Sequence, residues 1–443
     1  MSSPPEIRVI TPIRHPRLRY VLDLIGNDLG YRFLFYNDRS VFGPVEARYA
    51  VHYGGTGPRS LPRHPLLSGR DPAPADLAPE TGPDGLPLFF PTPGGHDLLA
   101  CIFWTVSRYE EYADFTPDRH GRFSASAAHA HRHGYLQRPV VREWTAALER
   151  RLRAWFPDLP PPRARPLAVR PTYDIDLLWA WQHRGWRGRA GLLKDTFQGR
   201  FSRAVARLRS GPQTDPYYTI GRLEEFHRQH GLLGTYFWLL AGGTSRVDPN
   251  PYPIPDAQRQ LMRRLEAHAR IGLHPSYRSP DRPELVTEER ERIEEILDHG
   301  VCCSRQHFLR FRLPATYRFL LEAGIREDHS MGYSDAVGWR AGTNLPFFWY
   351  DLSRETATPL VVHPFAAMDV TLRNYLGMDA AQAGTTIRSL AAAVLPVGGP
   401  FPLLWHNSSF AAEYGWEGWW EMYTTTLADL LAGEAVPWSP ETD

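Results

Sequence analysis

The chain has little cysteine, scarce lysine and no long hydrophobic run. Its 443 residues include three cysteines, too few for a disulfide framework. Because no stretch of about eighteen apolar residues occurs, we expect no membrane-spanning helix. The N-terminus lacks a basic region followed by an apolar stretch, so it does not resemble a secretory signal. We therefore expect the protein to work in the cytoplasm.

The charge balance excludes a strong overall electrostatic field. The formal net charge is +1 at pH 7, so nothing in the composition favours nucleic acid or an anionic membrane as partner. Hydrophobic residues make up 42% of the chain and charged residues 22%, as in ordinary globular proteins. The length exceeds that of one compact core and predicts about two or three domains.

The first third of the chain predicts a small α/β unit. Apolar spacing predicts strands at 7–10, 31–36 and 49–53 and helices at 17–29, 98–106 and 139–155. Residues 54–95 are rich in Pro, Gly and Asp and are expected to be largely loop. The proline-rich segment Phe156–Pro162 cannot continue a helix. We place a boundary there, between an N-terminal domain (1–158) and a second domain (163–435).

The second part predicts alternating strands and helices. Strands are expected at 167–173, 234–240, 271–274, 301–303, 324–328 and 402–406, and helices at 217–230, 256–269, 285–298, 315–323 and 380–395. This alternation favours a parallel sheet closed, or nearly closed, into a distorted (β/α) barrel. The predicted fold class is therefore α/β, with a smaller α/β domain before the barrel. In such barrels, functional side chains sit at the carboxyl ends of strands.

Five candidate side chains fall at those strand ends: Asp174, Asp176, His274, His307 and His406. In a strand, residues i and i+2 point to the same side, so both carboxylates can reach one site. Two close carboxylates repel unless a cation lies between them. Aspartate and histidine together suit zinc and similar divalent ions. The alternative for the acidic pair is a helix cap plus a surface acid, and for a single histidine a structural role.

The ordered motifs resemble those of the NodB-homology polysaccharide deacetylases, carbohydrate esterase family four. The stretches that carry the resemblance are Thr172–Asp176, Gly272–Arg278, Arg305–Phe308 and Leu403–His406. The resemblance spans residues 165 to about 425 and implies a NodB-type distorted barrel. The first 155 residues resemble an N-terminal domain found fused to such deacetylases in bacterial polysaccharide gene clusters.

The resemblance implies metal-dependent hydrolysis of the N-acetyl group of an acetylated amino sugar, with release of acetate. It implies Asp174 as general base, Arg305 as its charge partner and His406 as general acid. An acid orients that histidine; Asp328 is our candidate and Asp335 its competitor. The cofactor is a divalent metal, zinc first, with Co2+, Ni2+ or Mn2+ as alternatives. Zinc lowers the pKa of bound water from ~15.7 to about 7.

Two departures from the family pattern affect the metal shell. Arg278 stands where the motif has its second metal histidine, and an arginine stays protonated and cannot ligate a metal. His307 replaces the proline expected in the third motif. We hypothesise that His307 supplies the missing ligand, which gives the set Asp176, His274 and His307. The alternative is a site that has lost its metal or uses two protein ligands.

Substrate contacts are assigned to four side chains: Tyr277, Phe308, Arg340 and Trp405. Trp405 could stack on a sugar face, although core packing is the alternative role. Arg340 lies in a Gly-bracketed loop and could bind a phosphate or carboxylate, with a salt bridge as the alternative. The substrate itself is left open among a polysaccharide, an oligosaccharide and a nucleotide- or lipid-linked sugar. The N-terminal domain is a candidate site for that carrier or for a partner enzyme.

Three other functions compete with deacetylation. A non-catalytic sugar-binding pseudoenzyme is suggested by Arg278. A manganese-dependent Asp-x-Asp glycosyltransferase would leave His274 and His406 unexplained. A haloacid-dehalogenase-like phosphatase would need Thr or Val where Leu178 stands, and a well-placed lysine.

Overall fold

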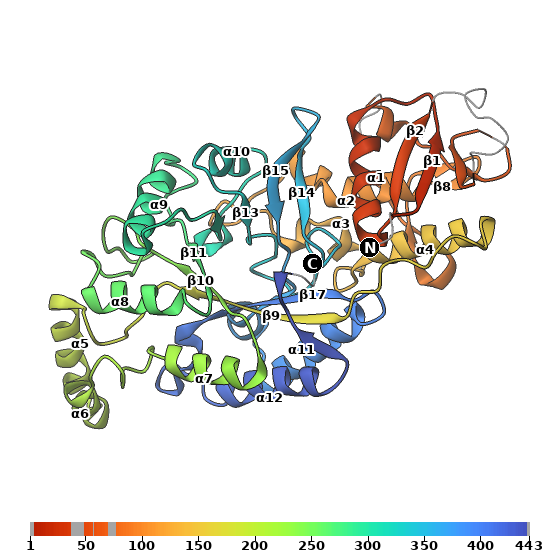
Figure 1. Cartoon of the computed structure of the whole chain (residues 1–443). Helices are drawn as coiled ribbons and strands as arrows, with labels where there is room; N and C mark the ends of the chain where they lie inside the picture. Colours follow the sequence, from red (N-terminus) through yellow and green to blue (C-terminus); the bar gives the residue numbers. More distant parts are fainter. Residues whose placement is uncertain (1–3, 37–47, 56, 70–76, 441–443) are drawn as a thin grey trace.

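The computed structural model describes residues 4–36, 48–55, 57–69 and 77–440. Its strands form a four-stranded sheet, a ten-stranded sheet and two short two-stranded ribbons. The sheets and the helices around them give a mixed α/β fold (Figure 1). Position 56 and residues 70–76, part of the predicted 54–95 loop, lie outside the described residues. The described part of that loop holds only short strands and single turns.

The four-stranded sheet lies in the first third of the chain and is parallel throughout, in the order β2-β1-β3-β4. Its elements and their helices are β1 (Glu6–Ile10), α1 (Pro16–Leu29), β2 (Arg32–Tyr36), β3 (Ala50–Tyr53), β4 (Ser60–Leu61), α2 (Leu98–Val106), α3 (His129–Arg132) and α4 (Val140–Trp155). Helix α1 has Pro16 in its first turn and ends at Gly30, whose φ of 74° is left-handed. Helix α2 begins at Asp97, whose side chain accepts from the N–H groups of Leu99 and Ala100.

The ten-stranded sheet occupies the rest of the chain. Its order is β14-β15-β13-β12-β11-β10-β9-β17-β16, and β18 also pairs with β9. The strands are β9 (Leu167–Ile175), β10 (Thr235–Trp238), β11 (Arg270–Leu273), β12 (Cys303–Ser304), β13 (Glu327–Asp328), β14 (Phe347–Asp351), β15 (Thr356–Val362), β16 (Ala367–Met368), β17 (Gly399–His406) and β18 (Ala435–Pro437). All pairs are parallel except β14–β15.

The predicted parallel sheet is therefore present, but the barrel is not confirmed. Among the described residues the end strands β14 and β16 do not pair with each other. Strand β9 is buried along its whole length, and it pairs with β10, β17 and β18. Its apolar residues are interrupted by Arg170, Thr172 and Asp174, which are also buried.

Eight helices of the described ranges follow β9. They are α5 (Gly185–Phe197), α6 (Phe201–Arg209), α7 (Ile220–His230), α8 (Asp256–Leu265), α9 (Glu284–Leu297), α10 (Ala315–Glu322), α11 (Ala380–Val394) and α12 (Trp419–Ala432). Helices α5 and α6 were not predicted, and they stand at one edge of the molecule (Figure 1). None of the helices in the described ranges has the length and apolar character that crossing a bilayer requires.

Buried polar contacts join the first third of the chain to the rest. Arg142 of α4 donates to Asp28, to the side chain of Asn344 and to the carbonyl of Gly398. Arg340 donates to Glu111 over 2.9 Å. The boundary at Phe156–Pro162 stays a prediction, and these contacts show that the two parts share a polar core.

Candidate active site

The register of the large sheet brings the candidate strand ends to one level. Asp174 pairs with Phe237 of β10 on one side and with His406 of β17 on the other. Leu273 at the end of β11 pairs with Ser304 at the end of β12. The residues that follow these strand ends therefore lie at the same edge of the sheet.

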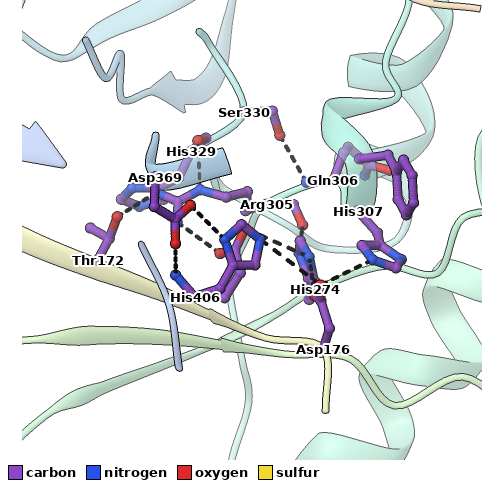
Figure 2. Close-up of polar contacts among 12 residues, drawn as sticks. Thr172, Asp176, His274, Arg305, Gln306, His307, His329, Ser330, Asp369 and His406 are labelled. Carbon is purple, nitrogen blue, oxygen red and sulfur yellow. Dashed lines mark hydrogen bonds and ion pairs between the residues drawn. The ribbon is translucent and has the colours of Figure 1, made fainter. Parts of the chain in front are cut away.

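Three candidate ligands converge at this edge: Asp176, His274 and His307, whose ligand atoms all lie within 4.8 Å of one another. The Nε2 atom of His274 is 3.2 Å from Asp176 Oδ1, and that of His307 is 3.5 Å from Asp176 Oδ2. Figure 2 shows both rings turned toward Asp176. Arg278, in contrast, is exposed and not part of this group.

The Nδ1 atoms of His274 and His307 each contact an oxygen atom on the side away from Asp176. His274 Nδ1 contacts the carbonyl oxygen of Arg305 at 2.5 Å, and His307 Nδ1 contacts Asp248 Oδ1 at 3.1 Å. Such contacts fix the orientation of metal-ligating histidines and leave Nε2 for the ion. Asp248, in the loop after β10, was not predicted from the sequence.

The donor set fits a divalent cation. His274 Nε2 and Asp176 Oδ1 are buried and lack a partner of hydrogen-bond geometry. Burial acts to raise the pKa of Asp176, but the surrounding histidines lower it well below its usual range. Burial also opposes protonation of His307, but Asp176 and Asp248 raise the pKa of this imidazole to about 9. A cation between these groups would give the unpartnered Nε2 and Oδ1 atoms a partner.

Asp174 is held by a fully buried arginine. Arg305 donates to Asp174 Oδ1 and to Thr172 Oγ1, both over 2.8 Å, and to the carbonyl of His329 over 2.9 Å. The other carboxylate oxygen, Asp174 Oδ2, is 3.6 Å from His274 Nε2. Arg305 therefore fixes one oxygen of Asp174 and leaves the other beside the candidate metal ligands.

Asp369 orients His406 through two contacts, whereas Asp328 was predicted for this role. Asp369 Oδ1 is 2.8 Å from His406 Nδ1, and Asp369 Oδ2 accepts from the backbone N–H of His406 over 2.6 Å. Burial acts to lower the pKa of His406, but Asp369, helped by Asp176 and Asp174, raises it to about 10. The ring's Nε2 lies 3.9 Å from Asp176 Oδ2 (Figure 2).

The two acids predicted for that role are engaged elsewhere. Asp328 accepts hydrogen bonds from Tyr317 and from the side chain and N–H of Ser330. Burial raises the pKa of Asp328 to about 6. Asp335 accepts from the N–H of Ala125. Neither contacts His406, so the assignment of Asp328 as its orienting acid is wrong.

Two predicted substrate contacts are also wrong. Arg340 is buried, and its guanidinium donates to both oxygens of Glu111. Trp405 is completely buried and packs against Phe410 and Tyr423. Its place follows from strand geometry, because the neighbour of His406 on β17 must point to the opposite face of the sheet.

The two other predicted substrate contacts lie beside His307. The Phe308 ring is 4.8 Å from that of His307 and 5.1 Å from that of Tyr277, and both side chains are partly exposed. The Tyr277 hydroxyl is 2.9 Å from His120 Nδ1. The first third of the chain thus reaches this side of the site, a contact that the sequence did not predict.

A second cluster of possible ligands, Glu327, His329 and His363, lies elsewhere in the sheet. Its surroundings are cationic, because Arg270 donates to Glu327 over 2.8 Å and Arg170 lies 2.9 Å from His363 Nδ1. Burial opposes ionisation of Glu327, but its contacts with the two histidines and Arg270 hold its pKa well below the usual range. We read this cluster as a structural ion-pair network.

A family model matches the first third of the chain. Residues 7–157 match a family of unknown function (DUF7033). No curated protein matches the sequence. Neither result assigns an activity to the candidate site.

Solved structures with some similarity come from several bacteria. A Mycobacterium smegmatis protein named as a polysaccharide deacetylase is 17% identical, with a TM-score of 0.40 over 62% of this chain and 87% of its own. A family 4 carbohydrate esterase from Streptomyces lividans is 11% identical, with a TM-score of 0.31 over 63% and 96%. A CE4 family pseudoenzyme from Bacillus anthracis is 11% identical, with a TM-score of 0.32 over 63% and 66%. These scores are too low to establish a shared fold.

Proposed function

We propose that this protein is a metal-dependent deacetylase that removes the N-acetyl group from an acetylated amino sugar and releases acetate. The observation that carries the proposal is the convergence on Asp176 of two oriented histidines, with a buried Asp174–Arg305 pair on one side and a His406–Asp369 pair on the other. One pair suits a base and the other an acid, as amide hydrolysis requires.

Asp176, His274 and His307 are the residues that would hold the ion, zinc first among the candidates. When bound, such an ion polarises the acetyl carbonyl and lowers the pKa of water. Aspartate with two imidazoles leaves an open position for water and substrate. The two Nδ1 contacts keep both rings in place for this role.

Asp174 and His406 would move the protons. Asp174 Oδ2 faces the ligands and would accept a proton from the attacking water, while Arg305 holds Oδ1 in an ion pair of 2.8 Å. His406 Nε2 would donate its proton to the amine nitrogen as the C–N bond breaks. The raised pKa keeps His406 protonated near neutral pH. The hydroxyl group of the water thus ends in acetate, and a proton ends on the free amine.

The substrate would enter on the side of Asp176 and His406. The side chains of these residues are 26% and 14% exposed, whereas those of Asp174 and His274 are 3% and 1% exposed. Tyr277 and Phe308 offer partly exposed aromatic surface beside His307, which suits contact with a sugar ring.

Acetate release tests the proposal. The full-length protein is incubated with N-acetylglucosamine oligomers as purified, after removal of metal by a chelator, and after addition of zinc. We expect acetate to form, to stop after chelation and to return with zinc. Metal binding without acetate release from oligomeric, nucleotide-linked or lipid-linked substrates would favour the pseudoenzyme. Release that survives complete metal removal would contradict the proposal.

The competing transferase and phosphatase functions gain no support from the site. The transferase would leave His274 and His406 unexplained, and the phosphatase would need a well-placed lysine, whereas the single lysine of the chain, Lys194, is exposed on α5. The pseudoenzyme remains the alternative, because Arg278 and His307 depart from the family pattern at the metal shell.

A further inference from the structure

Helices α5 and α6 form a hairpin whose apolar side chains face solvent. Leu193 and Phe197 lie four residues apart on α5, and Phe201, Val205 and Leu208 have i, i+4, i+7 spacing on α6, so each set shares one helix face. All five are exposed, Phe197 to 88% and Leu208 to 69%. A surface helix normally turns such a stripe toward the core. We call these five residues the apolar stripe.

The inner side of the hairpin is polar instead. Asp195 is buried and forms an ion pair of 3.0 Å with Arg207, and Arg203 lies 4.0 Å from it. The guanidinium of Arg203 stacks over Tyr414, and that of Arg207 lies over Trp181. These contacts hold the hairpin against the body with the apolar stripe directed outward.

The charge of the hairpin is strongly positive. Residues 185–209 contain seven basic residues and one acid, although the whole chain has a net charge of only +1. Lys194, Arg200 and Arg209 are exposed next to the apolar stripe and form no ion pair among the described residues. Exposed aromatic and aliphatic residues flanked by cations are typical of helices that lie in the interface of an anionic membrane.

We propose that the α5–α6 hairpin docks the protein on an anionic lipid bilayer surface. The apolar stripe would enter the boundary between headgroups and acyl chains, and Lys194, Arg200 and Arg209 would contact lipid phosphates. A second copy of the chain is a poorer occupant, because it would place the cations of both copies against one another.

The hairpin is tied to the strands that carry the candidate site. Asp215 accepts hydrogen bonds from the N–H groups of Ala180, Trp181 and Gln182, between Asp176 and α5. Tyr414 accepts from Trp181 and follows His406 by eight residues. If the proposed deacetylation holds, on which this step rests, docking would favour a lipid-linked N-acetylated sugar as substrate.

Vesicle flotation tests the docking without any substrate. The full-length protein is mixed with phosphatidylcholine vesicles, with or without phosphatidylglycerol, at low and high salt. We expect binding to the vesicles with phosphatidylglycerol, weakened by salt. The variant Phe197→Ser/Phe201→Ser/Leu208→Ser should bind at least about tenfold more weakly, since it loses buried apolar surface. The variant Lys194→Gln/Arg200→Gln/Arg209→Gln should lose the preference for phosphatidylglycerol.

A matched control removes exposed apolar side chains elsewhere. Phe348→Ser/Leu376→Ser/Leu395→Ser changes three residues that are also exposed, and it should bind as the unaltered protein does. Circular dichroism should show that all variants fold. Three outcomes would overturn the proposal: no binding by the unaltered protein, equal binding by the stripe variant, or a dimer that the stripe variant dissolves without vesicle binding.

Activity separates this inference from the proposed function. Acetate release is measured with soluble N-acetylglucosamine oligomers and with an N-acetylglucosaminyl glycolipid in vesicles. The stripe variant should keep its rate on the oligomers and lose at least about tenfold on the glycolipid. Vesicle binding without any acetate release would contradict the proposed deacetylase function but not the proposed docking. Equal rates of the stripe variant and the unaltered protein on the glycolipid would remove the lipid-linked substrate.

Discussion

Arg122 donates a hydrogen bond of 2.8 Å to the carbonyl oxygen of Phe308, and so connects the first third of the chain with the segment that carries His307. Phe308 has a φ of 59°, a conformation that non-glycine residues rarely adopt unless their surroundings hold it. Asp118 anchors Arg122 over 2.8 Å. The first third of the chain therefore helps to shape the candidate metal site.

Replacement of Arg122 should weaken this site from a distance. Arg122→Ala leaves the carbonyl of Phe308, next to His307, without its donor, and we expect metal affinity to fall about tenfold, the lower end of the loss that follows removal of a direct partner of a metal ligand. Titration with zinc under a competing chelator measures the change. Arg132→Ala, an exposed arginine in the same part of the chain, is the control and should bind metal normally. Unchanged zinc affinity in both variants would show that the first third of the chain does not shape the metal site.

Metal analysis should distinguish His307 from Arg278. We expect His307→Ala to lose bound zinc, because Nε2 is one of three converging donors. Arg278→Ala should keep its zinc, because Arg278 is exposed and outside the group. Elemental analysis of the purified proteins gives the occupancy. Equal occupancy in the two variants would remove His307 from the ligand set.

The two carboxylates of β9 and its end should behave differently. Asp176→Asn replaces one of the two oxygens toward which the histidines point with an NH2 group and removes the negative charge, so we expect zinc to be lost. Asp174→Asn should retain zinc better and still lose activity by about a hundredfold or more, as expected for a general base. Occupancy and acetate release are measured on the same preparations. The reverse order of zinc retention would mean that base and ligand are exchanged.

Asp369→Asn should shift the pH profile of the reaction. His406 must be protonated to act as an acid, so the rate falls as the pH rises through the pKa of His406. Asp369 is the largest of the influences that raise this pKa. Without its charge the pKa decreases, and the basic limb of kcat/KM against pH should move to lower pH, with a loss of about a hundredfold.

Asp335→Asn is the matched control for that experiment. Asp335 contacts Ala125 and not His406, so both the rate and the pH profile should stay unchanged. If Asp335→Asn shifts the basic limb and Asp369→Asn does not, the assignment of the orienting acid is mistaken.

Glu111→Gln should affect stability and leave metal binding alone. Glu111 is buried between Arg340 and Arg108, which lower its pKa against the effect of burial. Loss of its charge leaves buried cations uncompensated and should cost about 3–5 kcal/mol of unfolding free energy. Denaturant melts measure the loss. A normal melt with a raised KM would instead restore Arg340 as a substrate contact.

The position of the site at one edge of the sheet could be predicted from the sequence, because the carboxyl ends of parallel strands meet at that edge. This rule predicts that Asp174, Asp176, His274 and His406 lie together. The same rule would have found Asp369, which directly follows the two-residue strand β16. That strand is too short to give a periodic signal, and Asp328, the acid that the sequence favours, ends an equally short strand.

Other parts of the site depend on contacts that no local pattern records. Asp248 lies in a long loop, and its contact with His307 spans 59 residues. The pairing of Arg340 with Glu111 spans 229 residues. Helices α5 and α6 were not predicted, although Phe201, Val205 and Leu208 of α6 follow helical spacing.

The ion network of Glu111 also limits which chain segments can be combined. An N-terminal segment without an acid at this position would bury Arg340 with no counter-charge, and a second segment without Arg340 would remove one of the two cations that Glu111 pairs with. Gene fusion or recombination near Phe156–Pro162 would thus yield stable proteins only when both halves change together. The pairing of Glu111 with Arg340 therefore restricts which N-terminal segments can be joined to which second segments.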